Sequence, residues 1–107
     1  CLSAKIAEEA GFQALFLSGG ALAYSVLGRP DFGFLSLAEF GTAIQHIVSS
    51  VYAPLIADAD NGFGNAIQAA NTGAMYEQFG AAGLQIDDKV RLGVNGTKDQ
   101  SCENCSF

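Results

Sequence analysis

The stretch that most constrains the fold is a short apolar run that ends in two carboxylates. Residues 54–57 read Pro-Leu-Ile-Ala, and Asp58 and Asp60 follow before a loop that contains two glycines. An apolar run of this length, bounded by turn residues, is typical of a buried strand in a parallel sheet. Because strand residues two apart point to the same side, Asp58 and Asp60 are predicted to share one face where the strand ends.

Two carboxylates on one face favour a bound cation. Like charges at such close range are unfavourable unless a cation or a proton lies between them. Oxygen ligands of this kind suit a hard divalent ion, Mg²⁺ above all. The alternative is an ordinary turn rich in Asp, Asn and Gly, which is common after strands. The spacing alone leaves both interpretations open.

Strand-like and helix-like segments alternate along the chain. This alternation indicates an α/β fold with a parallel sheet and crossover helices. In the clearest helix, Ser36 and Glu39 have the spacing of a capping box, and His46 lies off the apolar stripe, so we expect it to be a solvated surface residue. The predicted strands cover 13–17, 54–57 and 84–87, and the predicted helices 4–10, 21–27, 37–51 and 65–79.

Apolar residues at helical spacing identify the faces that two of these helices should bury. The helix that follows the acidic strand has a weaker pattern, because it contains an internal glycine and several alanines. The predicted inward positions are Leu37, Phe40, Ile44, Ile47 and Val51 in the first helix and Ile67, Ala70, Ala74 and Phe79 in the second.

All three predicted strands end in residues suited to binding or catalysis. These are the turn of residues 18–20 (Ser-Gly-Gly), Asp58 with Asp60, and Asp87. Active sites of β/α barrels and of doubly wound sheets lie at the carboxyl ends of the strands. The turn can present backbone N–H groups to an anion, although a glycine pair also makes an ordinary tight turn. A dinucleotide-binding fingerprint and a phosphate-binding loop with its lysine are both absent.

The composition and charge argue against some classes of binding partner. The 107 residues suffice for one small domain, and the formal charge of −6 without a basic cluster argues against nucleic acid and anionic membranes. No apolar run approaches the length of a membrane span. No signal peptide is visible, so a cytoplasmic or organellar-matrix location is the default expectation. Cys102 and Cys105 form a single Cys-x-x-Cys, which is weak support for zinc, and we assign them no role.

Several segments together resemble the isocitrate lyase and phosphoenolpyruvate mutase superfamily. The most specific is the Asp-Ala-Asp-x-Gly-aromatic-Gly-Asn signature at 58–65, and the resemblance covers residues 1 to about 90. Residues 91–107 are expected to form an irregular polar tail. The other segments that carry the resemblance are residues 2–12, 17–20, 27–31 and 86–89.

The resemblance implies a fold and an activity. The chain would be a partial (β/α)8 TIM-type barrel with about three parallel strands and flanking helices, out of the eight strands of a whole barrel. Members are Mg²⁺-dependent lyases, mutases and decarboxylases that act on a small 2-oxo or 2-hydroxy carboxylic acid through an enolate, with C–C or C–P bond chemistry. Full-length members are expected to be homo-oligomers.

The resemblance also implies a metal site made of four carboxylates. Asp58 would ligate Mg²⁺ directly, and Asp60 and Asp31 would support the ion largely through its waters. Asp87 stands where the family usually has Glu and would face the metal as well. The shorter side chain of Asp87 reaches one methylene less far, which could loosen the metal shell.

The sequence contains only part of the substrate-binding and catalytic residues that the resemblance implies. The resemblance implies that Ser18, Gly19 and Gly20 hold the substrate carboxylate. Lyases of the family carry a Lys-Arg-Cys-Gly type loop soon after the third strand, and nothing in this chain matches it. Cys102 and Cys105 lack the flanking basic residues and glycine of that loop, so no catalytic residue is assigned.

Two alternatives to an active enzyme remain open from the sequence. The first is a truncated, catalytically inactive fragment of such an enzyme, in which unpaired strand edges would be exposed. The second is a small acidic binding module unrelated to the family.

Overall fold

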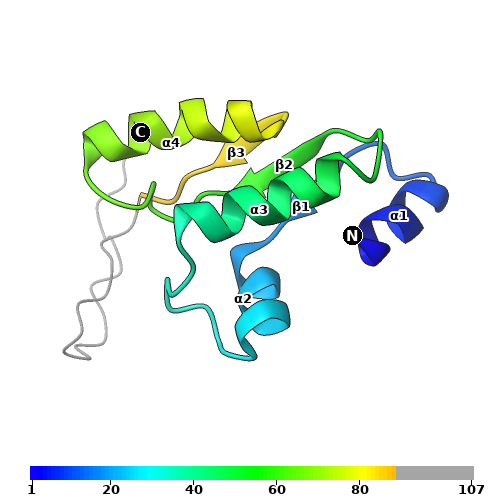
Figure 1. Ribbon diagram of the computed structural model, residues 1–107, viewed down its shortest axis with the longest axis horizontal. Coiled ribbons are helices and arrows are strands. Elements are labelled where there is room, and N and C mark those ends of the chain that lie inside the picture. Colours follow the sequence, from blue (N-terminus) through cyan, green and yellow to red (C-terminus); the bar gives the residue numbers. More distant parts are fainter. Residues whose placement is uncertain (89–107) are drawn as a thin grey trace.

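The computed structural model describes residues 1–88. Helices and strands alternate as the sequence predicts, and the helices are joined to the strands by short loops (Figure 1). The predicted tail, with Cys102 and Cys105, lies outside the described residues. Within the described part, no helix is long and apolar enough to span a bilayer. The elements are α1 (Leu2–Glu9), β1 (Leu15–Leu17), α2 (Gly19–Leu27), α3 (Leu37–Val48), β2 (Leu55–Asp58), α4 (Ala66–Phe79) and β3 (Gly83–Gln85).

The three strands form one parallel sheet in the order β1-β2-β3. Leu17 pairs with Ala57 across the first ladder, and Asp58 pairs with Gln85 across the second. Because consecutive strands are parallel neighbours, the chain must cross back between them, and it does so through α2 and α3 and then through α4. The predicted parallel sheet with flanking helices is therefore confirmed.

Local sequence signals begin and end the helices. Ser36 caps α3 in a capping box with Glu39, and Asn65 caps α4 in the same way with Gln68. The backbone N–H and the hydroxyl of Ser36 both donate to Glu39 Oε2 at 2.7 Å, which holds the pKa of this carboxyl below its usual value. At the other end of α4, Gly80 adopts the left-handed conformation that glycine favours after a helix.

The core lies between one face of the sheet and the helices α3 and α4. Leu55 and Ala57 of β2 point into it, and Phe40 and Ile44 of α3 pack over them. In Figure 1, α3 crosses in front of the sheet and α4 runs beside β3. The predicted buried stripe of α3 is confirmed at its centre, because Phe40 is 3% and Ile44 0% exposed. His46 is exposed, as predicted.

The predicted inward face of α4 is confirmed at Phe79, which is partly buried against the core, and is wrong at its other three positions. Ile67 is 80% exposed, and Ala70 and Ala74 are exposed as well. The buried positions are Thr72 and Tyr76, each 1% exposed. Hydrophobic spacing failed here because the two side chains that face inward carry hydroxyl groups, and these groups are satisfied by hydrogen bonds that hydrophobicity does not reveal.

The opposite face of the sheet is bare within residues 1–88. Phe16 and Ile56 are partners in the β1–β2 register and remain 52% and 41% exposed. Strand residues alternate between faces, so these two side chains point away from the side that carries Leu55 and Ala57. In a closed β/α barrel this face lines the interior.

Candidate metal and substrate site

Asp58 is the last residue of β2, and backbone groups from two segments fix its carboxylate. The Gly19 N–H donates to Asp58 Oδ2 at 3.0 Å, and the Asp60 N–H donates to Asp58 Oδ1 at 2.9 Å. The first bond joins residues 39 positions apart in the sequence. Both oxygens are thus held, and the side chain has a defined direction toward the start of α2.

Asp31, from the loop after α2, approaches the same point. A methyl group placed on Gly19 would lie 3.0 Å from Asp58 Oδ2 and 3.1 Å from Asp31 Oδ2. The other oxygen of Asp31 accepts a bond from the Gly33 N–H at 3.3 Å. The structure therefore brings together two of the four predicted metal-binding carboxylates at the backbone of Gly19.

Asp60 and Asp87 lie beyond the ends of the neighbouring strands β2 and β3. The Asp87 N–H donates to the backbone carbonyl of Asp60 at 2.7 Å, and Asp87 Oδ1 accepts from Gln85 Nε2 at 3.4 Å. Within residues 1–88, however, no three His, Cys, Asp or Glu side chains are grouped closely enough to form a ready set of ligands. The metal-binding roles of Asp31, Asp58, Asp60 and Asp87 stay predictions.

The turn of residues 18–20 begins α2 immediately after β1. Ser18 is the N-cap, and its hydroxyl oxygen accepts from the Ala21 N–H at 3.4 Å. The N–H of Gly19 is engaged by Asp58, so Gly19 links this turn to the acidic residues. Gly19 is buried and leaves no room for a side chain, because Phe40 Cζ would lie 3.2 Å from an added methyl group.

The acidic loop, which we define as residues 59–65, has an unusual backbone. Asp60 (φ 48°), Gly62 (φ 83°) and Phe63 (φ 61°) all adopt positive φ values. A left-handed conformation costs a non-glycine residue about 1–2 kcal/mol, so neighbouring contacts must maintain it. The Phe63 ring packs on Phe40 with centroids 5.4 Å apart and an interplanar angle of 62°.

Tyr76 is a site residue that the sequence did not reveal. Its hydroxyl donates to the backbone carbonyl of Asp58 at 2.7 Å. Burial, followed by the negative charges of Asp58 and Asp60, raises the pKa of Tyr76 well above its usual value, so the hydroxyl stays protonated and remains a donor. The only signal in the sequence is that Thr72 and Tyr76 are four residues apart on one helix face.

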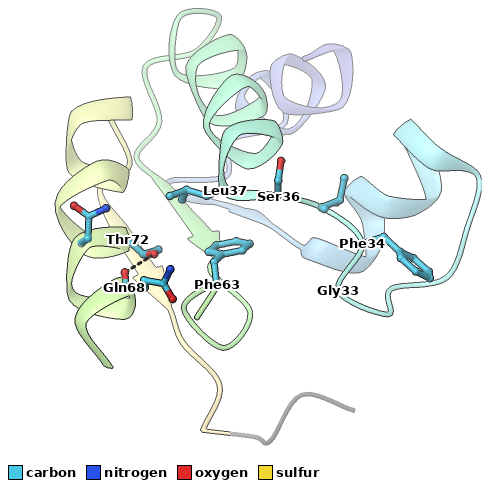
Figure 2. Close-up of a pocket in the computed structure, with 9 residues that line it drawn as sticks. Gly33, Phe34, Ser36, Leu37, Phe63, Gln68 and Thr72 are labelled. Carbon is cyan, nitrogen blue, oxygen red and sulfur yellow. Dashed lines mark hydrogen bonds between the residues drawn. The ribbon is translucent and has the colours of Figure 1, made fainter. Parts of the chain in front are cut away.

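A cavity of about 460 Å³ lies beside the acidic loop (Figure 2). Phe63 borders it, and the hydroxyl of Thr72 donates to the carbonyl of Gln68 at its wall. None of the residues that line the cavity is charged, so the cavity does not include the four acidic residues of the predicted metal site. The lining residues are Gly33, Phe34, Leu35, Ser36, Leu37, Phe63, Gln68, Asn71 and Thr72.

A family comparison identifies the family of the chain. The model of the family described as phosphoenolpyruvate phosphomutase matches residues 1–105. The chain belongs to this family. The resemblance to the isocitrate lyase and phosphoenolpyruvate mutase superfamily is thereby confirmed.

Relatives within the family include lyases. The 2,3-dimethylmalate lyase of Eubacterium barkeri is 39% identical over 89 residues, which are 83% of this chain and 31% of that protein. The 2-methylisocitrate lyase of Aeropyrum pernix is 45% identical over 87 residues, which are 81% of this chain and 28% of that protein. The chain therefore spans less than a third of the length of these relatives.

Solved structures of the superfamily confirm the fold class. The crystal structure of 2,3-dimethylmalate lyase, a phosphoenolpyruvate mutase/isocitrate lyase superfamily member, superposes with a TM-score of 0.78 at 40% identity, covering 84% of this chain and 32% of that one. A phosphonopyruvate hydrolase complex with oxalate and Mg²⁺ superposes with a TM-score of 0.79 at 40% identity, covering 83% and 31%. The three parallel strands are thus a partial β/α barrel.

The residues present suit a magnesium ion held partly through water. Asp58 and Asp31 offer carboxylate oxygens that converge on one point. Asn61, the residue that follows Asp60 in the sequence, has a buried Oδ1 with no donor among the described residues, and a buried acceptor without a partner is unfavourable. Mg²⁺ usually keeps several waters and takes only one or two protein carboxylates, so an ion with its waters fits this donor set.

Proposed function

We propose that this chain is the metal-binding part of a Mg²⁺-dependent lyase, mutase or decarboxylase. Its substrate would be a small 2-oxo or 2-hydroxy carboxylic acid, and an enolate would form as a C–C or C–P bond is made or broken. The observation that carries the proposal is the convergence of Asp58 and Asp31 on the backbone of Gly19. The names of the relatives support the reaction class, and the phosphonopyruvate hydrolase complex with oxalate and Mg²⁺ supports both the metal and a small carboxylic acid.

All four carboxylates would contribute to binding the ion. Asp58 would bind it directly, because its side chain is fixed from two sides. Asp31, Asp60 and Asp87 would hold its waters. When bound, the cation supplies Lewis-acid stabilisation of a developing negative oxygen.

The start of α2 would bind the substrate carboxylate. The N-terminus of a helix carries partial positive charge and outward-pointing N–H groups, which favour an anion. Ser18 and Gly20 flank Gly19, whose own N–H is engaged with Asp58. The substrate carboxylate would therefore lie next to the metal-binding residues, with Gly19 shared between the two.

A second candidate is a catalytically inactive piece of such an enzyme. It is favoured by the bare face of the sheet, where Phe16 and Ile56 are exposed, and by the lack of any assigned catalytic residue. The two candidates differ in turnover: only the first converts oxaloacetate or a phosphonate. Both retain a metal site if the acidic residues bind Mg²⁺.

Titration of Mg²⁺ into the wild type and into Asp58→Asn by calorimetry tests the metal site. We expect Asp58→Asn to weaken the Kd at least tenfold, about 1.4 kcal/mol, because it removes the charge that faces the ion. The matched control is Glu9→Gln, which removes one exposed charge from α1 and should leave the Kd within twofold. Thermal unfolding is followed in parallel, since the new amide also meets a backbone N–H. Equal affinity in the wild type and Asp58→Asn would show that Asp58 is not a ligand.

A further inference from the structure

We propose that the hydroxyl groups of Thr72 and Tyr76 form a clamp on α4 that positions the Asp58 carboxylate. Neither residue is expected to touch metal or substrate; both act through the backbone of the segment 58–62. The inference deepens the proposed function, because the carboxylate in question is the predicted metal ligand.

The geometry of the clamp is defined by two hydrogen bonds. The Tyr76 hydroxyl donates to the carbonyl of Asp58 at 2.7 Å. The Thr72 hydroxyl lies 3.0 Å from the carbonyl of Gly62 and 3.0 Å from the carbonyl of Gln68 in its own helix, so its single proton is shared between these two acceptors. The two donors are four residues apart and so lie on the same face of α4. One helix thus holds both ends of the segment that carries Asp58 and Asp60.

The burial pattern of α4 indicates that the hydroxyls have a specific task. Thr72 and Tyr76 are each 1% exposed, whereas Ile67 on the same helix is 80% exposed. A helix that served only to cover the sheet would bury its large apolar residues, as α4 partly does with Phe79, and would expose a polar residue such as Thr72. Burying hydroxyl groups is favourable only where acceptors meet them. The acceptor for Tyr76 is the carbonyl of Asp58, and the acceptors for Thr72 are the carbonyl of Gly62 and, within α4, the carbonyl of Gln68.

The segment that the clamp holds needs an external support. Asp60 and Gly62 both have positive φ values. The segment is hydrogen-bonded to β3 at Gln85, through the Ala59 N–H, and to Asp87 just beyond β3, through the carbonyl of Asp60. The orientation of the Asp58 carboxylate depends on the Asp60 N–H, which lies within the same segment, and on the Gly19 N–H. Loss of either hydroxyl should loosen the segment and so release these two N–H groups.

Two variants remove only the hydroxyls: Tyr76→Phe and Thr72→Val. Amide hydrogen exchange is measured at Asp60 and Gly19, the two N–H groups that donate to the Asp58 carboxylate, and Mg²⁺ affinity is measured by calorimetry. We expect Tyr76→Phe to speed exchange at both sites and to weaken the Kd for Mg²⁺, each by about three- to tenfold, the range that one hydrogen bond supports. Thr72→Ser, which keeps the hydroxyl that Thr72→Val removes, should show exchange rates and a Kd for Mg²⁺ close to those of the wild type.

Two controls separate this role from general stability. Tyr52→Phe removes a hydroxyl from a fully exposed side chain and should change nothing. Val51→Ala creates a small cavity near the start of β2, at the far end of the strand from Asp58, and should lower stability without changing the Kd.

Each outcome of the experiment is decisive. If exchange at Asp60 and Gly19 is no faster in Tyr76→Phe and Thr72→Val than in Val51→Ala, the clamp does not exist. If exchange accelerates but the Kd for Mg²⁺ is unchanged, the hydroxyls hold the loop without positioning a ligand, and the inference is wrong in that respect. If exchange accelerates and the wild type binds no Mg²⁺, the clamp is supported and the proposed function is contradicted.

Discussion

Gly62→Ala is expected to lower the free energy of unfolding by about 4 kcal/mol. Two costs add at this position. Gly62 has φ +83°, a conformation that an alanine adopts only with strain, and an added methyl group would lie 2.6 Å from Ala69 Cβ and 3.0 Å from Ala69 Cα. The neighbour is the backbone of α4, which cannot rotate away as a long side chain can. The acidic loop would have to move off the helix.

The matched control for this change is Gly11→Ala. Gly11 has a similar φ of +94°, but nothing lies within 4 Å of the added methyl group. Its substitution should therefore cost only the backbone strain, about 1 kcal/mol. Urea denaturation followed by circular dichroism measures both values. Equal losses for the two variants would show that the contact between Gly62 and α4 is not as close as described.

The second large effect is expected for two glycine-to-alanine changes, at Gly41 in α3 and at Gly73 in α4, which should change the free energy of unfolding in opposite directions. Gly41 is buried on α3, and a methyl group there would lie 2.6 Å from Cε2 and Cζ of Phe79. Gly41→Ala should lower the free energy of unfolding by about 2 kcal/mol, because overpacking exceeds the gain in helix propensity. Gly73, in the middle of α4, has Leu84 Cδ2 at an ordinary 3.8 Å, so Gly73→Ala should raise it by about 1 kcal/mol.

Thermal and urea unfolding of the two single variants test this pair. A double variant provides the control: Phe79→Leu removes the ring that the new methyl group meets, and it should reduce the loss caused by Gly41→Ala. If Gly41→Ala destabilises the Phe79→Leu variant as much as it destabilises the wild type, the contact between Gly41 and Phe79 is not the cause of the loss.

The arrangement of the strand ends could be predicted because it follows from topology. Once the sequence indicates a parallel sheet, the carboxyl ends of its strands must meet at one edge, and this places Asp58, Asp60 and Asp87 at that edge. The particular contact between Gly19 and Asp58 could not be predicted. It joins residues 39 positions apart through a backbone N–H, and every residue type except proline carries such a group.

The inward face of α4 shows why the rest could not be predicted. Periodicity ranks positions by hydrophobicity, and by that measure Ile67 should be buried and Thr72 exposed. The structure reverses the order because the segment 58–62 presents carbonyl groups to the helix, and the hydroxyl groups of Thr72 and Tyr76 donate to them. Information about the partner loop, and not about the helix itself, decides which side of α4 faces inward.

The central place of β2 in the three-stranded sheet affects where the sheet can open first. As the middle strand it is paired along both sides, so fraying that starts at β1 or β3 reaches it last. Asp58 is therefore anchored in the one strand of the described sheet that is paired along both of its sides.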